Sequence, residues 1–540
     1  MKFFCACGSK ASPDCKLGRR VDGGCIDKFL PSLFALLLLV TAPGASVEQC
    51  PVQPIAGALF LHGGGAFPPP LMEEFLKLCD RPEGKLVVIP SAAEDGKINV
   101  LRIIEGWGNR GFAKVQVLHT RSRDEADTEE FIQPLRAACA VWISGGMQSR
   151  LEEAYVGTRV ERELHALLGR GGVVGGSSAG AAVMSKVMIR SGNPIAEVGQ
   201  GFGLIGGAVI DQHFVARKRE GRLLTVLDEH PGLVGYGIDE GTALVLRGRQ
   251  IWVVGSSTVT ACLAKSDHRE EFVEPRRHPW RADHIAMTRA AIVRAANLKF
   301  STVPAVVPKG TVIAFGGGGT TKGGLEHFVD RAGGSLARIV VIYTARADEP
   351  RLSQHWRRLW DSVGAKNVRA LHARDHDVAN SDAFVKEIDA AGGVWFDGGR
   401  QWRLVDRYSG TRAEAAIKRV LERGGVVGGS SAGATILGGY LVRGDPMTSR
   451  TMMQEGYEQG LGLVPGVAID QHFSQRNRFK DMLALKRRYP QLLGVGIDEG
   501  AAIAFEGGSC EVFGRNSVFI YPVDGERVEL KVGEKLKLVE

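Results

Sequence analysis

The sequence predicts an α/β fold made of two tandem domains, each with a mainly parallel sheet flanked by helices. Three observations support this prediction. The chain has 540 residues, which is too long for one ordinary core. Several motifs occur twice in the same order. Short apolar runs rich in Val and Ile alternate with longer, charged segments of helical period, as in parallel sheets covered by helices.

The duplication covers most of the chain. "VVGGSSAGA" begins at Val173 and again at Val426, and "LFLHGGGAF" from Leu59 corresponds to "VIAFGGGGT" from Val312. These copies are 253 residues apart, whereas the later copies of "IDQHF" and "GIDEG" are 259 residues apart. The second copy therefore carries six extra residues, within 443–460. We expect a leader over 1–46, a first domain over 47–273, a linker over 274–309 and a second domain over 310–540.

Within each copy the expected strands are short and end in Gly or small polar residues. They are 85–89, 140–143 and 172–174 in the first copy, and 339–342, 393–396 and 426–427 in the second. Helical period predicts helices over 149–170 and 410–423, and another over 284–298 inside the linker. The segments 251–255 and 510–514 are expected to be antiparallel strands at a sheet edge.

The N-terminus has the pattern of an export leader. Several basic residues precede an apolar run over 33–40, and small residues follow at Ala42, Gly44 and Ala45, as a signal peptidase requires. We therefore expect a secreted or periplasmic protein. The apolar run is short for a membrane span, so no stable span is expected once the leader is removed.

Composition excludes several classes of function. The formal charge is +8, but no basic stripe is interleaved with aromatic residues, so no nucleic-acid partner is expected. The chain has nine cysteines, four of them inside the predicted leader, and the others lie far apart. Their spacing predicts neither a disulfide framework nor a metal site.

The repeated serine motif predicts a nucleophile. Ser178 and Ser431 each stand at the centre of Gly-x-Ser-x-Gly, directly after an apolar run. This spacing suits a sharp strand-to-helix elbow, which exposes the hydroxyl above the sheet because the flanking side chains are small. A glycine-rich turn used for close packing, or for phosphate binding at a helix N-terminus, is the alternative.

A serine nucleophile needs a base and a carboxylate that orients the base. His213 and His472 are the only histidines that recur at matching places after the two serines. Glu240 and Glu499 each follow the histidine by 27 residues, just after an apolar run. The acids Asp211 or Asp239, with Asp470 or Asp498 in the second copy, are the alternatives for the orienting group.

Two further groups surround these residues in the sequence. Backbone N–H groups that could stabilise an oxyanion belong to Gly145, Gly146 and Ala179, and to Gly398, Gly399 and Ala432. A row of arginines follows each histidine: Arg217, Arg219 and Arg222, then Arg476 and Arg478, with Asp481 in place of a third. Arginines suit a substrate that bears carboxylates, although a solvated helix face is the alternative.

Taken together and in this order, these motifs resemble the serine-peptidase family of cyanophycinase and aspartyl dipeptidase. The resemblance implies a glutamine-amidotransferase-like (flavodoxin-like) fold and an active-site order of Ser, His and Glu in each copy. It implies no metal and no organic cofactor. It further implies the substrate-binding residues Gln148, Asp211, Arg217, Arg219, Arg222, Gln401, Asp470, Arg476 and Arg478. Because Asp481 departs from the pattern, the second site is expected to differ in substrate affinity.

The implied reaction is hydrolysis of cyanophycin, a poly-aspartate bearing arginine on each β-carboxyl, to β-Asp-Arg dipeptides through an acyl-enzyme. An aspartyl dipeptidase acting on short Asp-containing peptides is the nearest alternative. An α/β-hydrolase esterase places its acid before its histidine, unlike this chain. A secreted polymer-binding protein without catalysis is a further alternative. We expect the two copies to pack as an internal pseudo-dimer.

Overall fold

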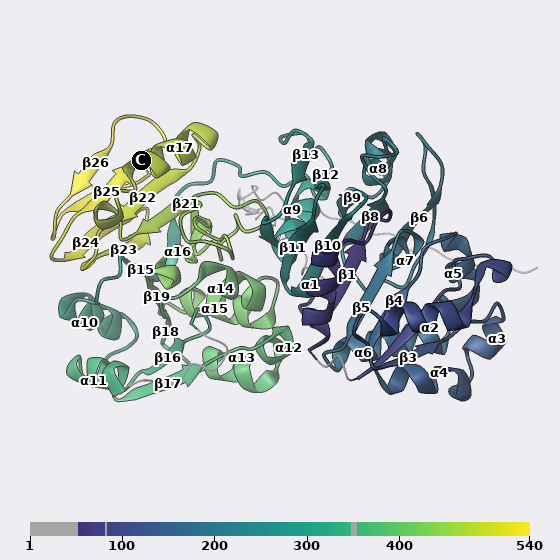
Figure 1. Ribbon diagram of the computed structural model, residues 1–540. Coiled ribbons are helices and arrows are strands. Elements are labelled where there is room, and N and C mark those ends of the chain that lie inside the picture. Colours follow the sequence, from purple (N-terminus) through teal and green to yellow (C-terminus); the bar gives the residue numbers. More distant parts are fainter. Residues whose placement is uncertain (1–51, 81–83, 347–353, 540) are drawn as a thin grey trace, which may run out of the picture. The chain divides into compact units, whose positions relative to one another are not determined.

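The computed structural model describes residues 52–80, 84–346 and 354–539 (Figure 1). The predicted leader, 1–46, lies outside the described residues. All described residues belong to one unit, which spans Ala45–Glu540. Two repeats of the same α/β architecture make up this unit: a first repeat over 55–295 and a second repeat over 307–537.

The larger sheet of the first repeat has eight strands in the order β14-β11-β10-β1-β5-β4-β2-β3. They are β1 (Ile55–His62), β2 (Lys85–Ile89), β3 (Lys114–Val117), β4 (Ala138–Ile143), β5 (Val173–Ser177), β10 (Thr242–Gly248), β11 (Gln250–Gly255) and β14 (Arg281–Asp283). The run from β1 to β3 is parallel, whereas β10, β11 and β14 are antiparallel to their neighbours. The predicted antiparallel strand is thus confirmed as β11, although β14 and not β11 forms the edge.

A smaller sheet has the order β13-β12-β9-β8, and β6 pairs with β7 in a separate hairpin. The strands are β6 (Val187–Ser191), β7 (Glu197–Gln200), β8 (Ala208–Gln212), β9 (Val234–Ile238), β12 (Val259–Leu263) and β13 (Phe272–Arg276). Both β13 and β14 pair with strands of the first repeat. The predicted linker starts at residue 274, but residues 274–276 and 281–283 belong to sheets of the first repeat.

The second repeat repeats this arrangement. Its larger sheet has the order β17-β16-β18-β19-β15-β23-β24-β27, and its smaller sheet has the order β20-β21-β22-β25-β26. The strands are β15 (Val307–Phe315), β16 (Arg338–Ile342), β17 (Asn367–Leu371), β18 (Gly393–Phe396), β19 (Val426–Ser430), β20 (Gly438–Tyr440), β21 (Val464–Gln471), β22 (Leu493–Ile497), β23 (Ala501–Gly507), β24 (Ser509–Gly514), β25 (Val518–Tyr521), β26 (Val528–Leu530) and β27 (Lys535–Lys537). The mainly parallel, tandem architecture predicted from the sequence is confirmed.

Helices flank the sheets of each repeat (Figure 1). In the first repeat they are α1 (Pro69–Cys79), α2 (Val100–Gly108), α3 (Arg123–Ala126), α4 (Glu129–Arg136), α5 (Gln148–Tyr155), α6 (Arg159–Gly169), α7 (Ala179–Ala182), α8 (Glu220–Glu229) and α9 (His284–Ala295). In the second they are α10 (Lys322–Arg331), α11 (Gln354–Ser362), α12 (His376–Asn380), α13 (Asp382–Asp389), α14 (Gln401–Tyr408), α15 (Arg412–Glu422), α16 (Ala432–Thr435) and α17 (Phe479–Arg488). Of these helices, α8, α9 and α17 pack on strands of the smaller sheets. The helix predicted over 149–170 is two helices, because Thr158 caps α6 by accepting from the Val160 N–H.

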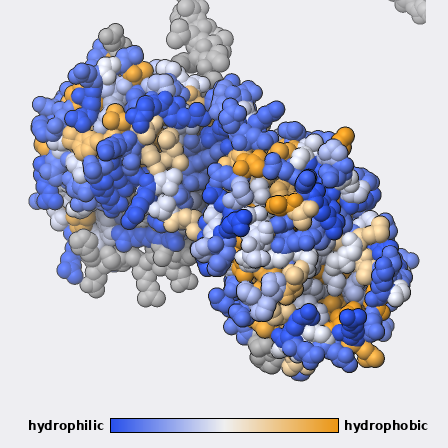
Figure 2. Space-filling view, turned by 45° about the horizontal axis from the view of Figure 1, so that its top comes forward, coloured by the Kyte–Doolittle hydropathy of each residue, from blue (hydrophilic) through white to orange (hydrophobic). Residues whose placement is uncertain are grey.

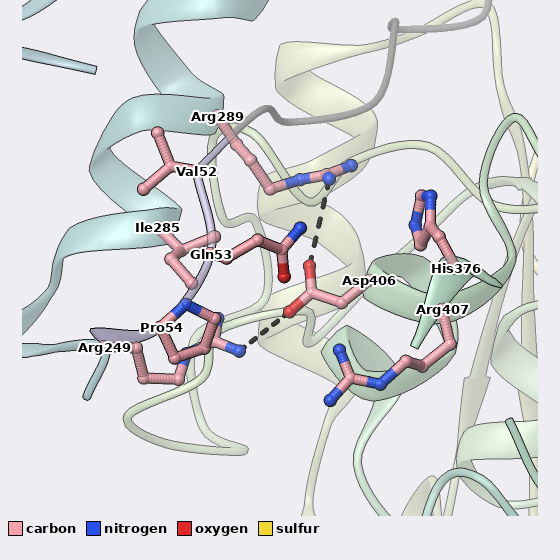
Figure 3. A pocket seen from close by; sticks show the side chains of 9 residues that line it. All are labelled: Val52, Gln53, Pro54, Arg249, Ile285, Arg289, His376, Asp406 and Arg407. Carbon is pink, nitrogen blue, oxygen red and sulfur yellow. Dashed lines mark hydrogen bonds and ion pairs between the residues drawn. The ribbon is translucent and has the colours of Figure 1, made fainter. Parts of the chain in front are cut away.

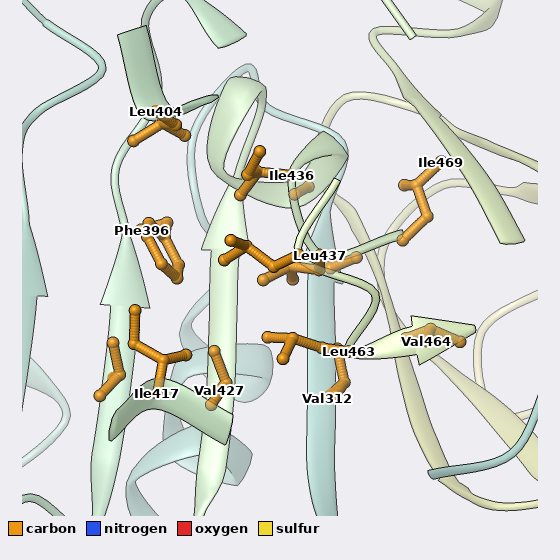
Figure 4. Close-up of a cluster of buried hydrophobic side chains, with 14 of the residues drawn as sticks. Val312, Phe396, Leu404, Ile417, Val427, Ile436, Leu437, Leu463, Val464 and Ile469 are labelled. Carbon is orange, nitrogen blue, oxygen red and sulfur yellow. The ribbon is translucent and has the colours of Figure 1, made fainter. Parts of the chain in front are cut away.

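The central strands bury both of their faces. In β16, Val340 and Ile342 enter one apolar cluster, whereas Ile339 and Val341 enter another on the opposite face. Side chains alternate across a strand, so a continuous apolar run is what a sheet covered on both sides requires. Figure 4 shows part of the first of these clusters, where Val312 of β15, Phe396 of β18 and Val427 of β19 lie near Ile436 and Leu437, which follow α16.

Opposite charges meet where the two repeats contact each other. Asp406 of α14 accepts from Arg249 of the first repeat at 2.8 Å and lies 3.8 Å from Arg289 of α9 (Figure 3). Arg294 of α9 donates to Glu455 at 2.7 Å. The cations come from the first repeat and the acids from the second, so the contact is electrostatically complementary.

The surface seen in Figure 2 is mainly hydrophilic, with hydrophobic residues in scattered patches. Among the residues that the structure describes, no helix is both long and apolar enough to cross a membrane.

Candidate active sites

Each predicted nucleophile lies at a sharp turn between a strand and a short helix. Ser178 connects β5 to α7 with φ 53° and ψ −113°, and Ser431 connects β19 to α16 with φ 56° and ψ −117°. The N–H of Ser178 donates to the carbonyl of His62 at 2.9 Å, and that of Ser431 donates to the carbonyl of Phe315 at 3.0 Å. Both serines therefore adopt the same elbow, as the Gly-x-Ser-x-Gly pattern predicts.

Histidine and glutamate reach the serine from two adjacent parallel strands. His213 follows β8 and Glu240 follows β9, and the carboxyl ends of parallel neighbours meet at one edge of a sheet. The Nε2 of His213 lies 2.9 Å from the Oγ of Ser178, and its Nδ1 lies 2.6 Å from the Oε1 of Glu240. The imidazole therefore lies within hydrogen-bond distance of both the serine and the glutamate, as predicted.

The second repeat has the same geometry. His472 follows β21 and Glu499 follows β22, which are also parallel neighbours. The Nε2 of His472 lies 3.0 Å from the Oγ of Ser431, and its Nδ1 lies 2.6 Å from the Oε1 of Glu499. The six extra residues between serine and histidine do not change these distances.

The hydrogen bonds define which imidazole nitrogen carries the proton. A carboxylate only accepts, so the Nδ1–H of His213 donates to Glu240 and its Nε2 accepts from the hydroxyl of Ser178. Burial lowers the pKa of His213, against the contact with Glu240, which raises it. The pKa of His472 is lowered for the same reason. Both imidazoles are thus neutral near pH 7 and able to accept a proton.

The other acids considered from the sequence bind elsewhere. Asp239 accepts from the N–H groups of Val215 and Ala216, at 3.1 and 3.0 Å. Asp498 accepts from the N–H of Ser474 at 2.8 Å. These carboxylates hold the loop after each histidine, and the carboxylate that contacts the imidazole is the glutamate.

A glycine loop, to which the sequence motifs assign no role, makes room for the histidine and the glutamate. A Cβ placed on Gly64 would lie 2.3 Å from the Cε1 of His213, and one on Gly65 would lie 2.9 Å from the Cβ of Glu240. Gly317 and Gly318 take these positions in the second repeat. The recurrence of these glycines in both copies is the sequence signal that points to this loop, which we call the glycine cradle.

The glycine pairs predicted as oxyanion donors lie beside the nucleophiles. A Cβ on Gly145 or on Gly398 would lie 3.2 Å from the Cβ of the neighbouring serine, Ser178 or Ser431. Gly146 and Gly399 pack so closely on the loop after the neighbouring strand, β2 or β16, that a Cβ would lie 2.1 Å from a carbonyl oxygen. Ala179 and Ala432 directly follow the serines and are buried. Their roles as donors stay a prediction.

Several predicted substrate-binding residues of the first repeat contact each other instead of solvent. Asp211 and Arg222 form a bidentate ion pair in which neither side chain is more than 3% exposed. Arg219 donates to the carbonyl and side-chain oxygens of Gln212, and burial lowers its pKa to about 10. Gln148 is also buried and donates to the carbonyl of Ile189. These side chains therefore support the site from inside the protein.

The second repeat obtains the corresponding guanidinium from another part of the chain. Arg443 donates to both carboxylate oxygens of Asp470, at 2.8 Å, and to Asp481, which occupies the place of the third arginine. Arg478 also donates to Asp470, and burial lowers the pKa of Arg478 to about 10. Gln401 is buried at the start of α14. The substitution at Asp481 is thus compensated by Arg443.

Arg217 and Arg476 differ from these buried side chains. Both are exposed, and within the described part of the chain neither guanidinium has an ion-pair partner. The backbone N–H of each donates to the carbonyl of the catalytic-site histidine, four residues before it. Of the predicted arginines, these two are the ones best placed to meet a ligand.

One polar contact distinguishes the first site from the second. His62 is buried, and its Nδ1 lies 2.9 Å from the Oγ of Ser177 while its Nε2 lies 3.2 Å from the carbonyl of Ala66. Burial lowers the pKa of His62 to about 4, so the ring is neutral at pH 7. Phe315 replaces His62 in the second repeat.

Comparison with known proteins assigns the family. Residues 59–254 and residues 312–513 each match peptidase family S51, so the match is duplicated and covers more than half of the chain. The chain belongs to peptidase family S51. This S51 protein is a serine-type peptidase with two tandem copies of the family domain.

The curated relatives of this S51 peptidase include cyanophycinases. It is 32% identical over 237 residues to the cyanophycinase of Nostoc sp. PCC 7120, covering 42% of this chain and 78% of that protein. It is 30% identical over 205 residues to the cyanophycinase of Geminocystis herdmanii, covering 37% of this chain and 75% of that protein. A crystal structure of a peptidase from an acI-B1 Actinobacterium is 25% identical, covering 42% of this chain and 97% of that chain with a TM-score of 0.34.

Proposed function

We propose that this S51 peptidase hydrolyses cyanophycin, a poly-aspartate that carries arginine on its β-carboxyl groups, to β-Asp-Arg dipeptides. The observation that carries the proposal is the Ser–His–Glu arrangement, which occurs twice with nearly equal distances. The similarity to cyanophycinases supports the substrate.

The hydrogen bonds suggest how each site would work. The Oγ of Ser178 attacks the carbonyl carbon of the scissile amide while its proton passes to the Nε2 of His213. Glu240 stabilises the imidazolium that forms, and backbone N–H groups stabilise the oxyanion. The C–N bond breaks as the imidazolium returns the proton to the leaving amine. Water then attacks the acyl ester in the same way and releases the acid. No step in this scheme calls for a metal or an organic cofactor.

The charges around the sites suit such a substrate. Arg217 and Arg476 are exposed next to the histidines, and a guanidinium binds a carboxylate through two parallel hydrogen bonds. We assign these two arginines to the carboxylates of the aspartate backbone. The buried residues Asp211 and Asp470 are each held by arginines of the protein, so we assign them to positioning of the loop after the strand.

Mass spectrometry of the products released from insoluble cyanophycin tests this function. We expect β-Asp-Arg dipeptides from the unaltered chain, and partial loss of activity in Ser178→Ala and in Ser431→Ala. The double variant is expected to lose on the order of 10⁶ in kcat, the loss typical of removing a catalytic serine. Undiminished turnover by the double variant would exclude both nucleophiles.

An assay on Asp-containing dipeptides discriminates the alternative. If the chain cleaves short Asp-X peptides but releases nothing from cyanophycin, it is an aspartyl dipeptidase. If purified protein binds cyanophycin and hydrolyses neither substrate, the polymer-binding alternative holds. Export of the chain is likewise a proposal, which fractionation of the producing cells would test.

A further inference from the structure

The two sites differ at the residue that precedes the glycine pair. Ser144 stands there in the first repeat and Asp397 in the second, 253 residues later. Asp397 is buried, with a side chain 2% exposed. Its Oδ1 accepts from the backbone N–H of Gly398 at 2.8 Å, and its Oδ2 accepts from the Nε of Arg346 at 2.5 Å. The backbone N–H of Gly398 in the second site is therefore already hydrogen-bonded to a carboxylate.

The glycine that carries this N–H lies next to the nucleophile. A Cβ on Gly398 would lie 3.2 Å from the Cβ and 3.8 Å from the Oγ of Ser431. The corresponding distances from Gly145 to Ser178 are the same, so the glycine pairs approach their serines alike. The difference lies in the hydrogen bond, because the N–H of Gly145 has no acceptor among the residues that the structure describes.

An ion pair holds the carboxylate in this place. Arg346 follows β16, and its side chain is 44% exposed. Burial raises the pKa of Asp397, whereas the contact with Arg346 and the N–H of Gly398 lower it. Ala93 stands where the first repeat would need this arginine. Both members of the pair are thus particular to the second repeat.

We propose that Asp397 withholds the Gly398 N–H from the oxyanion and so makes the second site the slower of the two. The inference rests on the proposed function, because it presumes that Ser431 is a nucleophile. Two effects act in the same direction. The donor is already occupied, and the carboxylate repels the negative charge that develops nearby. Loss of one oxyanion donor typically lowers the rate by about 10²–10³, and the neighbouring Arg346 offsets part of the repulsion.

Labelling with an alkyl fluorophosphonate tests the inference without a peptide substrate. The bond from serine Oγ to phosphorus forms, the P–F bond breaks, fluoride leaves, and the hydroxyl proton passes to the histidine. The phosphoryl oxygen then takes the place of the oxyanion. Ser178 and Ser431 lie in different proteolytic peptides, so mass spectrometry of the full chain follows both rates in one sample.

We expect Ser431 to be labelled about 10-fold or more slowly than Ser178. Asp397→Ser should accelerate labelling of Ser431 about 10-fold, in kinact and not in KI, and leave Ser178 unchanged. The reciprocal variant Ser144→Asp should slow Ser178 and leave Ser431 unchanged. Asp389→Ser, which removes an exposed carboxylate of the same repeat, is the matched control and should alter neither rate.

The outcomes separate this inference from the proposed function. If Ser431 reacts no faster in folded Asp397→Ser, and Ser178 reacts no more slowly in Ser144→Asp, Gly398 is not the donor and the inference is overturned. If neither serine is labelled in any variant, the nucleophiles and the proposed function fail together with it. Circular dichroism checks folding. Should Asp397→Ser misfold, Ser144→Asp alone decides, since an unchanged rate at Ser178 would overturn the inference.

Discussion

The backbone of each nucleophile lies in a region that residues other than glycine rarely occupy. Ser178 and Ser431 both have positive φ with ψ near −115°. Small neighbours permit this turn, since a Cβ on Gly176 would lie 2.3 Å from the carbonyl oxygen of Gly180, and one on Gly180 would lie 2.1 Å from that of Ile143. Flanking glycines are therefore a steric requirement of the elbow.

The glycine cradle leads to a prediction about the histidine. Gly64→Ala places a methyl group where the imidazole of His213 now lies, so the base must move away from Ser178. We expect kcat of the first site, measured in a Ser431→Ala background, to fall about 10²-fold, the loss typical of a displacement near 1 Å. Gly171→Ala is the control, because Gly171 also has positive φ but a Cβ there would meet no atom within 4 Å. Equal losses in the two variants would assign the effect to backbone strain.

The pH dependence of the first site follows from the environment of His213. The base must be neutral, and burial lowers its pKa below the ordinary value of about 6.5. In the Ser431→Ala background, kcat/KM should therefore fall with decreasing pH only below about pH 6.5. Glu240→Gln removes the contact that raises the pKa, so it should move this midpoint to still lower pH while lowering kcat. A midpoint above pH 7 would contradict the assignment.

Repetition made the reacting residues predictable from the sequence. Ser178, His213 and Glu240 each recur in the same order, and the spacing of 27 residues from histidine to glutamate is kept in both copies. The sequence left the choice between Glu240 and Asp239 open, because adjacent residues at a strand end point to different partners. Only the fold shows that Asp239 binds the backbone of the following loop.

At the level of the elements, the two repeats place one arginine differently. Arg190 and Arg443 occupy equivalent positions 253 residues apart. Arg190 pairs with Glu152 in the first repeat, where Arg222 neutralises Asp211. In the second repeat Val405 stands in place of Glu152, and Arg443 turns to the buried Asp470 instead. Each buried aspartate thus keeps a guanidinium that comes from a different element.

This exchange predicts losses of stability of different size at the equivalent positions 190 and 443. Arg222→Met and Arg443→Met each leave a fully buried aspartate with one remaining arginine, so each should lower the free energy of unfolding by on the order of 3 kcal/mol. Arg190→Met, at the position equivalent to Arg443, should cost within about 1 kcal/mol because its side chain is 36% exposed.

Urea unfolding followed by tryptophan fluorescence measures these differences. Similar losses in Arg190→Met and Arg443→Met would mean that the buried aspartate does not depend on the exchanged arginine.

The alternation of strands and helices was predictable because central strands are continuous apolar runs. The boundary between the first repeat and the linker was harder to predict from the sequence. The strands β13 and β14 are half exposed and lack an apolar run, so nothing in their sequence marks them as members of the sheets of the first repeat. Their place in the sheets is set by backbone pairing of β13 with β12 and of β14 with β11, which forms only in the folded chain.

For the whole molecule, the additional residues of the second repeat have a place in the contact between repeats. Gly456 accepts from Arg289 at 2.9 Å, and Glu455 and Glu458 bind arginines of the first repeat. All three lie within the segment 443–460, in which the second repeat is six residues longer than the first. This arrangement supports the proposal that the duplicated chain forms an internal pseudo-dimer.

Asp406 is the centre of this contact, and its charge should govern the coupling of the repeats. Its carboxylate is 8% exposed and accepts from Arg249 and from the hydroxyl of Tyr457, at 2.8 and 2.7 Å. Asp406→Asn leaves Asp283 as the acid that pairs with Arg249 and removes the acid that pairs with Arg289. We therefore expect the free energy of unfolding to fall by on the order of 3 kcal/mol. Asp389→Asn, whose ion pair is exposed on the second repeat, should cost within about 1 kcal/mol.

Calorimetry of the full chain resolves whether this loss reflects the contact or one repeat alone. If the charge couples the repeats, Asp406→Asn separates their unfolding into two transitions, since each repeat has its own buried clusters and remains folded after the other melts. The control Asp389→Asn should unfold with the same number of transitions as the unaltered chain. A single transition that shifts equally in both variants would show that the repeats are held together by surface other than this ion pair.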